Sequence, residues 1–191
     1  MLYLASQSPR RRMLLRRLKR PFKVVRCSYR EHIRQNAAPS QNAMRNAAGK
    51  ARKAILPRNS RGIIIGADTF LYFHGRVIGK PKTLSQAFRM IESLSGKMHR
   101  VYTGLCLLDV QTRKQRLSFA VSKVSFNHVG RDTIHAMFKS IPPLDKAGGY
   151  AAQGNHRLIK KIEGSRTNVI GLPLELLRRE LKCLRPRGVA K

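Results

Sequence analysis

The hydrophobic residues of this chain fall into short blocks whose spacing alternates between that of strands and that of helices. Compact apolar runs predict β-strands, and residues 62–67 are apolar throughout, which is typical of a strand in the middle of a sheet. The predicted strands cover residues 2–5, 22–25, 62–67, 70–73, 76–78, 101–110, 117–126 and 158–162. Amphipathic spacing and capping residues predict helices at residues 10–18, 43–56, 84–94, 132–139 and 173–184.

Strands and helices follow one another along the chain in a way that predicts a mixed-sheet α/β fold. The two longest predicted strands, residues 101–110 and 117–126, are separated by a short polar turn and are expected to pair antiparallel. We expect one domain over residues 1–184, followed by a frayed basic tail at residues 185–191.

The composition is that of a folded protein rather than a disordered or membrane-spanning one. Of its 191 residues, 42% are apolar, which is enough to form a sizeable core. Its apolar runs are shorter than the roughly 20 residues that a membrane helix needs, and residues 1–5 are too short an apolar stretch for a signal peptide. The three cysteines are far apart in sequence, so we expect reduced thiols in a cytoplasmic protein.

Charge sets this chain apart, because 40 lysines and arginines oppose only 9 acidic residues and give a formal net charge of +31. Such a chain attracts polyanions, so it could be a nucleic-acid binder. The basic residues run along the whole sequence, however, and the chain has no tryptophan and no zinc-finger spacing. The charge is therefore equally compatible with a general surface trait and incidental nucleic-acid binding.

The segment from Ser6 to Arg11 joins the first predicted strand to a helix that begins at Ser8-Pro9. Free backbone N–H groups and the positive end of the helix dipole make such a junction a natural site for anions. Ser6 adds a hydroxyl, and Arg10 and Arg11 add forked donors matched to phosphate. The structural alternative is an ordinary capped basic helix.

Two of the rare carboxylates follow predicted strands, and a third opens a loop. Asp68 lies in the Gly-Ala-Asp-Thr segment at residues 66–69, Glu31 follows the strand at residues 22–25, and Asp145 opens a later loop. Because ligands of α/β sheets gather at the carboxyl ends of strands, Asp68 could bind a divalent metal or accept a proton from water. An Asx-type turn is the structural alternative.

Two further segments offer groups for a ligand. Lys80 lacks the flanking sequence of a phosphate-binding P-loop, so it is either a point charge for a phosphate or an exposed turn lysine. Residues 145–154 form a glycine-punctuated loop in which Gln153 could read the edge of a base. A loop with a purely structural role is the alternative.

Together these segments resemble the Maf family of nucleoside triphosphate pyrophosphatases, also called septum formation inhibitor proteins, from residue 2 to residue 181. One such motif carries little information, whereas this many in the same order form a strong signal. The matching segments are residues 4–11, Glu31, 49–51, 66–69, 79–81, 95–96, 99–104, 145–150 and 168–173.

The resemblance implies an elongated, curved mixed sheet flanked by helices, with two lobes around a central cleft, as in inosine triphosphate pyrophosphatases. It implies hydrolysis of a nucleoside triphosphate to the monophosphate and pyrophosphate with a divalent metal, Mg²⁺ or Mn²⁺, and it suggests a homodimer. By this resemblance Asp68 is the catalytic carboxylate and binds the metal together with Glu31. The positions that handle phosphate are matched by Ser6, Arg10, Arg11, Lys50 and Lys80.

The resemblance also implies a substrate. Arg11, Thr69 and Gln153 follow the pattern of the branch that acts on dTTP and UTP, while the branch acting on 7-methyl-GTP carries Trp, Gln and Glu there. Two positions depart from the family, because Arg30 and Gly49 stand where acids are usual. Losing both carboxylates lowers the negative charge near the metal. A scaffold without catalytic activity that binds polyanions is therefore the rival hypothesis.

Overall fold

A computed structural model describes residues 1–34, 36–153 and 157–184 of the chain. The basic tail predicted at residues 185–191 lies outside this part. Within the described residues, none of the helices has the length and apolar character needed to cross a lipid bilayer.

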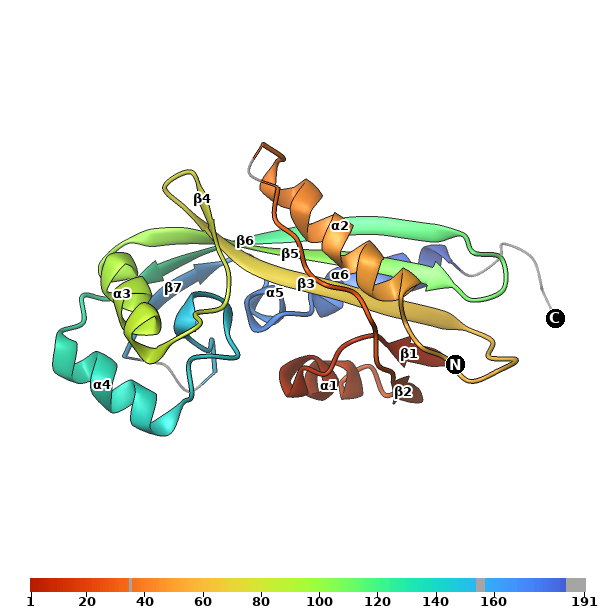
Figure 1. The fold of residues 1–191 in the computed structure, drawn as a ribbon, viewed down its shortest axis with the longest axis horizontal. Helices are drawn as coiled ribbons and strands as arrows, with labels where there is room; N and C mark the ends of the chain where they lie inside the picture. The colour runs from red at the N-terminus through yellow and green to blue at the C-terminus, as the bar shows by residue number, and fades with distance from the viewer. Residues whose placement is uncertain (35, 154–156, 185–191) are drawn as a thin grey trace.

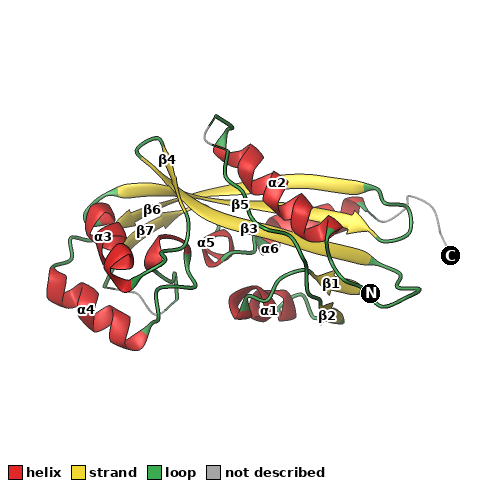
Figure 2. Cartoon of the chain, in the orientation of Figure 1, coloured by secondary structure: helices red, strands yellow, loops and turns green. Residues whose placement is uncertain are grey.

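The centre of the fold is a seven-stranded mixed sheet in the order β2-β1-β3-β5-β6-β7, with β4 paired to β3 as well (Figures 1 and 2). Among the strands of the described residues, only β1 makes parallel pairs, with β2 and with β3, and the other pairs are antiparallel. The strands are β1 (Leu2–Leu4), β2 (Phe22–Val24), β3 (Ile63–Phe73), β4 (Arg76–Ile78), β5 (Met98–Asp109), β6 (Gln115–Phe126) and β7 (Ile159–Glu163). The predicted mixed α/β sheet is confirmed.

Helices cover both faces of this sheet (Figure 1). The helix α2 lies on one face, where its alanines pack against Ile64, Cys106 and Leu108. The other face is covered by α1 and α6 at one end and by α3 and α4 at the other. The helices are α1 (Pro9–Arg16), α2 (Pro39–Arg52), α3 (Leu84–Leu94), α4 (Arg131–Ser140), α5 (Arg166–Ile170) and α6 (Leu174–Cys183), with a 3₁₀ turn η1 (Ala147–Gly149).

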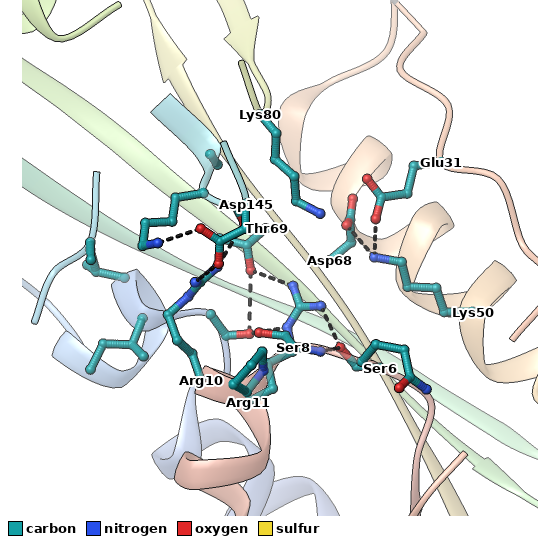
Figure 3. Close-up of a pocket in the computed structure, with 18 of the residues that line it drawn as sticks. Ser6, Ser8, Arg10, Arg11, Glu31, Lys50, Asp68, Thr69, Lys80 and Asp145 are labelled. Carbon is teal, nitrogen blue, oxygen red and sulfur yellow. Dashed lines mark hydrogen bonds and ion pairs between the residues drawn. The ribbon is translucent and has the colours of Figure 1, made fainter. Parts of the chain in front are cut away.

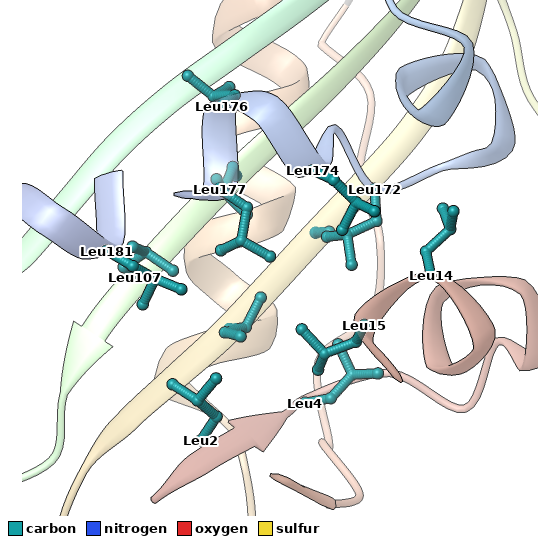
Figure 4. Packing of buried hydrophobic residues seen from close by; sticks show 13 residues of the cluster. Leu2, Leu4, Leu14, Leu15, Leu107, Leu172, Leu174, Leu176, Leu177 and Leu181 are labelled. Atoms are coloured by element: carbon teal, nitrogen blue, oxygen red, sulfur yellow. The ribbon is translucent and has the colours of Figure 1, made fainter. Parts of the chain in front are cut away.

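Two separate apolar clusters on the face opposite α2 define the two lobes. In the first lobe, leucines of β1, α1 and α6 pack against Ile65 and Leu107 of the sheet (Figure 4). In the second lobe, Phe88 and Ile134 of α3 and α4 pack against Leu71 near the other end of β3. Residues between the clusters therefore do not fill a common core, and this leaves room for a cleft beside the middle of β3.

Three elements differ from the sequence-based prediction. The segment 66–69 is not a turn after a strand, because β3 continues through it and pairs with β5 as far as Tyr72. The helix α2 begins at Pro39, before the predicted start at residue 43, and ends at Arg52, before the predicted end at residue 56, because Ile55 donates its N–H to the Arg26 carbonyl beside β2. A short helix at residues 166–170, capped by the Ser165 hydroxyl, was not among the predicted helices.

Candidate active site

The candidate site is a pocket of about 400 Å³ at the one edge of β3 to which both β1 and β4 pair. The register of β1 ends at Ile65 and that of β4 begins at Leu71, so the backbone between them faces the pocket (Figure 3). The walls come from the β1–α1 connection, residues 27–31, α2 and residues 145–152. This volume lies within the range of small-molecule sites.

Asp68 is held at the pocket wall by two donors from α2. The Asp68 carboxylate is only 5% exposed, and its Oδ1 accepts a hydrogen bond of 2.7 Å from Lys50 Nζ. Its Oδ2 accepts a hydrogen bond of 2.8 Å from Asn46 Nδ2. Since Asn46 and Lys50 are four residues apart, both point from one face of the helix toward the same carboxylate.

Lys50 joins Asp68 to Glu31. The Lys50 ammonium lies 2.5 Å from Glu31 Oε1 as well as 2.7 Å from Asp68 Oδ1, so one cation bridges the two carboxylates. Partial burial raises the pKa of Glu31, but the charge of Lys50 and its hydrogen bond, with Lys80 and Arg11 further off, hold that pKa below its ordinary value. Glu31 is therefore ionised at neutral pH.

Arg11 is fixed in the wall by three acceptors. Its Nε donates to the Gly171 carbonyl at 2.8 Å, and its two terminal nitrogens donate to Ser6 Oγ at 3.2 Å and Thr69 Oγ1 at 3.1 Å. Burial lowers the pKa of Arg11, and Asp68 and Glu31 oppose that effect. The two predicted specificity residues Arg11 and Thr69 are therefore in direct contact.

Arg10 reaches across the pocket from α1 to the second lobe. One guanidinium nitrogen donates to Asp145 Oδ2 at 2.5 Å and another to the Asp145 carbonyl at 3.0 Å. Lys146 also contacts the Asp145 carboxylate. Burial raises the pKa of Asp145, and its hydrogen bonds to Lys146 and Arg10 lower it below the ordinary value.

The remaining predicted residues have different positions. Lys80 lines the pocket and points toward Asp68 and Glu31 (Figure 3). Gln153 is not among the lining residues of the described chain, and its Nε2 lies 3.5 Å from Met13 Sδ on α1. Its predicted part in reading a base stays a prediction.

Two site residues were not singled out from the sequence. Asn46 lies in an alanine-rich helix, and the only clue was a polar residue four positions before Lys50. Tyr29 lines the pocket and donates its hydroxyl proton to Asn46 Oδ1 at 3.2 Å. Its position gave no signal of its own.

The donor set fits a divalent cation that arrives with a phosphorylated ligand. Asp68 and Glu31, which share the Lys50 ammonium, supply the carboxylate oxygens that Mg²⁺ prefers. Within the described residues, no group of three or more acidic, histidine or cysteine side chains could enclose an ion without such a ligand. Mg²⁺ is commonly bound by one or two carboxylates and by substrate phosphates, so two carboxylates suffice.

The charges of the wall define the class of ligand. Five cationic side chains and three carboxylates line the pocket, which favours a polyanion of small-molecule size. The cationic residues are Arg10, Arg11, Lys50, Lys80 and Lys146. A mixed-sheet α/β protein with such a pocket belongs to the class of proteins that handle phosphorylated small molecules.

Comparison with known proteins gives the family. The model of the family described as Maf-like protein matches residues 1–184, and the chain belongs to this family. A protein of Alkaliphilus oremlandii (strain OhILAs) named dTTP/UTP pyrophosphatase is 41% identical over 172 residues, which cover 90% of this chain and 89% of that protein. A protein of the same name from Thermococcus kodakarensis (strain ATCC BAA-918 / JCM 12380 / KOD1) is 38% identical, with 93% of each chain covered.

A solved structure is also similar. The Staphylococcus aureus Ham1 protein matches with a TM-score of 0.49 and 13% identity, covering 95% of this chain and 98% of that one.

Proposed function

We propose that this protein hydrolyses a nucleoside triphosphate to the monophosphate and pyrophosphate, with dTTP and UTP as its substrates. The observation that carries the proposal is the pair of carboxylates, Asp68 and Glu31, bridged by Lys50 within a cationic pocket. Membership of the Maf-like family, with relatives named dTTP/UTP pyrophosphatase, supports this hydrolase activity.

The cationic residues bind and orient the triphosphate. Arg10 and Arg11 flank the start of α1, where the Ser8 hydroxyl, as N-cap, makes no capping hydrogen bond within the described chain. Lys80 approaches from the second lobe. Donors fixed in advance around the phosphates stabilise the charge that develops when the phosphoryl bond breaks.

Asp68 orients the attacking water and takes up its proton. The water oxygen forms a bond to the α-phosphorus, the bond from that phosphorus to the oxygen bridging to the β-phosphorus breaks, and pyrophosphate leaves with that oxygen. Lys50 pairs with both the Asp68 and the Glu31 carboxylates and holds them close together. A divalent ion held by the same two carboxylates would neutralise charge on the phosphate oxygens.

Preference for dTTP and UTP rests on the contact between Arg11 and Thr69. Both side chains are held by further partners, Ser6 and Gly171 for Arg11 and Thr103 for Thr69, so they form a rigid part of the wall. Such a wall presents fixed donors to a base. We also propose that the protein is cytoplasmic and forms a homodimer.

Pyrophosphate release measures this function directly. Purified protein should release pyrophosphate from UTP and dTTP in the presence of Mg²⁺ or Mn²⁺, more slowly from GTP, and release should stop with a chelator. The charge of +31 keeps a second candidate open, a polyanion-binding protein without turnover. That candidate would be supported by no pyrophosphate release from any nucleotide together with nucleic-acid binding that weakens steeply with salt.

A further inference from the structure

Asn46 connects Asp68 to the loop that carries Glu31. It is a buried residue of α2, 1% exposed, whose amide nitrogen donates to Asp68 Oδ2 at 2.8 Å. Its amide oxygen accepts two hydrogen bonds, from the Tyr29 hydroxyl at 3.2 Å and from the His32 main-chain N–H at 3.1 Å. Because the oxygen is committed to two donors, the nitrogen of the same amide must face Asp68.

Tyr29 can take this position because residue 49 has no side chain. A Cβ built on Gly49 would lie 2.2 Å from Tyr29 Cε2, inside the aromatic ring. The ring of Tyr29 therefore occupies the space that a side chain at residue 49 would need. Gly49, which stands where the family usually has an acid, therefore leaves the space in which Tyr29 lies when it donates to Asn46.

We propose that Asn46 is a positioning residue that fixes the orientation of the Asp68 carboxylate. Lys50 holds one carboxylate oxygen, and a single hydrogen bond leaves the group free to rotate about its own axis. The second bond, from Asn46 to Oδ2, removes this rotation. The inference rests on the proposed function of Asp68.

Replacing Asn46 tests this role. Asn46→Leu keeps the approximate shape and removes both the donor to Asp68 and the acceptor for Tyr29. Loss of an outer partner of a ligating carboxylate lowers activity or metal affinity about 10- to 100-fold. We expect kcat for UTP to fall by about that factor with KM changed less than about twofold. Mn²⁺ affinity of the protein with a non-hydrolysable UTP analogue bound, measured by calorimetry, should fall in parallel.

Asn42 provides a matched control. It is also fully buried on α2, one turn before Asn46, but its hydrogen bonds join it to the main chain of Arg34 and Ala37 and to the Arg45 side chain, and none of them involves Asp68. Asn42→Ala should lower the melting temperature and leave kcat and Mn²⁺ affinity within about twofold of the wild type. Tyr29→Phe, which keeps the ring over Gly49, should lower kcat a few-fold and serves if Asn46→Leu does not fold.

The outcomes separate the two proposals. Wild-type kcat and wild-type Mn²⁺ affinity in Asn46→Leu, with a melting temperature lowered as in Asn42→Ala, would show a purely structural role and overturn the inference. A wild-type protein that releases no pyrophosphate would overturn the proposed function instead. Mn²⁺ titration of the same variants would then still decide whether Asn46 orients Asp68.

Discussion

Gly66 of β3 lies directly beneath the main-chain carbonyl of Ala47 on α2. A Cβ on Gly66 would be 2.1 Å from the Ala47 oxygen and 3.0 Å from the Ala51 nitrogen. Gly104, on the neighbouring strand β5, lies in the same way beneath Ala43, with a Cβ position 2.2 Å from its carbonyl oxygen. The two glycines let the backbone of α2 approach the sheet closely. This approach brings the Asn46 and Lys50 side chains of α2 within hydrogen-bonding distance of Asp68.

Gly66→Ala should therefore both destabilise the protein and impair the site. The added methyl group meets backbone atoms, which cannot rotate away, so α2 has to move outward. Overpacking of this kind costs about 1–3 kcal/mol, which urea unfolding can measure. Turnover should fall as well, because α2 carries Asn46 and Lys50 away from the carboxylate.

Gly79→Ala is the control for this substitution. No atom lies within 4 Å of a Cβ at Gly79, and its backbone does not have a positive φ. The change in unfolding free energy should be within about 0.5 kcal/mol of zero. Equal urea midpoints for Gly66→Ala and the wild type would show that the helix does not depend on this contact.

Asp68→Asn should abolish most turnover while the fold persists. The amide cannot accept the proton of the attacking water, and loss of such a group lowers rates by about 10²- to 10⁴-fold. Lys50 would still be paired with Glu31, so no buried cation is left without a partner. Steady-state pyrophosphate release measures the turnover of Asp68→Asn, and thermal unfolding of the same sample measures its stability.

Glu163→Gln serves as the comparison for Asp68→Asn. This carboxylate lies at the end of β7, outside the pocket, and pairs with the exposed Lys161. Its removal should leave turnover unchanged. If Asp68→Asn kept the wild-type rate with UTP, the role given to Asp68 would be wrong.

The sequence pattern predicted the strands well where the strand preference of the residues themselves decides the structure. The apolar run at residues 62–67 and the long strands predicted at residues 101–110 and 117–126 are found as expected, since their side chains favour strands. The continuation of β3 through Asp68 was not predictable, because a buried carboxylate in a strand becomes acceptable only through Asn46 and Lys50. These partners come from a different element.

In the candidate site, too, residues of short motifs could be predicted, whereas contacts between distant parts of the chain could not. Resemblance to the family marked Ser6, Arg11 and Lys80 as phosphate-binding positions, and all three line the pocket. It could not reveal that Arg10 and Asp145, which are 135 residues apart, meet across that pocket. Such a contact depends on how the two lobes face each other, which no short motif encodes.

Arg10→Lys should weaken substrate binding more than it affects stability. The guanidinium of Arg10 reaches two acceptors of Asp145 at once, and lysine cannot present parallel donors in this way. We expect KM for UTP to rise about tenfold, equivalent to about 1.4 kcal/mol. The ion pair is partly exposed, so unfolding free energy should change by less than about 1 kcal/mol.

Arg12→Lys is the matched control, because Arg12 is exposed on the same helix and does not line the pocket. It should leave KM unchanged. A tenfold rise in both variants would instead indicate an effect that is not specific to the pocket. An unchanged KM in Arg10→Lys would remove Arg10 from the proposed phosphate-binding residues.

His99 should make the stability of the protein depend on pH in the acidic range. Its side chain is 1% exposed, and its Nε2 lies 2.8 Å from the Tyr150 hydroxyl. Burial lowers the pKa of His99 from 6.5 to about 4. The folded protein therefore keeps this imidazole neutral in a pH range where the unfolded chain binds a proton.

The direction of the effect follows from this difference in proton binding. As pH falls from 6.5 to about 4, the unfolded chain gains a proton at His99 that the folded chain does not, so the unfolding free energy decreases. The full pKa difference corresponds to roughly 3 kcal/mol. His99→Gln can still bond to Tyr150 but does not titrate, and the exposed His128 gives the control His128→Gln. In urea unfolding across this pH range, the unfolding free energy of His99→Gln should depend less on pH than that of the wild type or of His128→Gln. The same pH dependence in all three proteins would show that His99 is protonated in the folded protein as readily as in the unfolded chain.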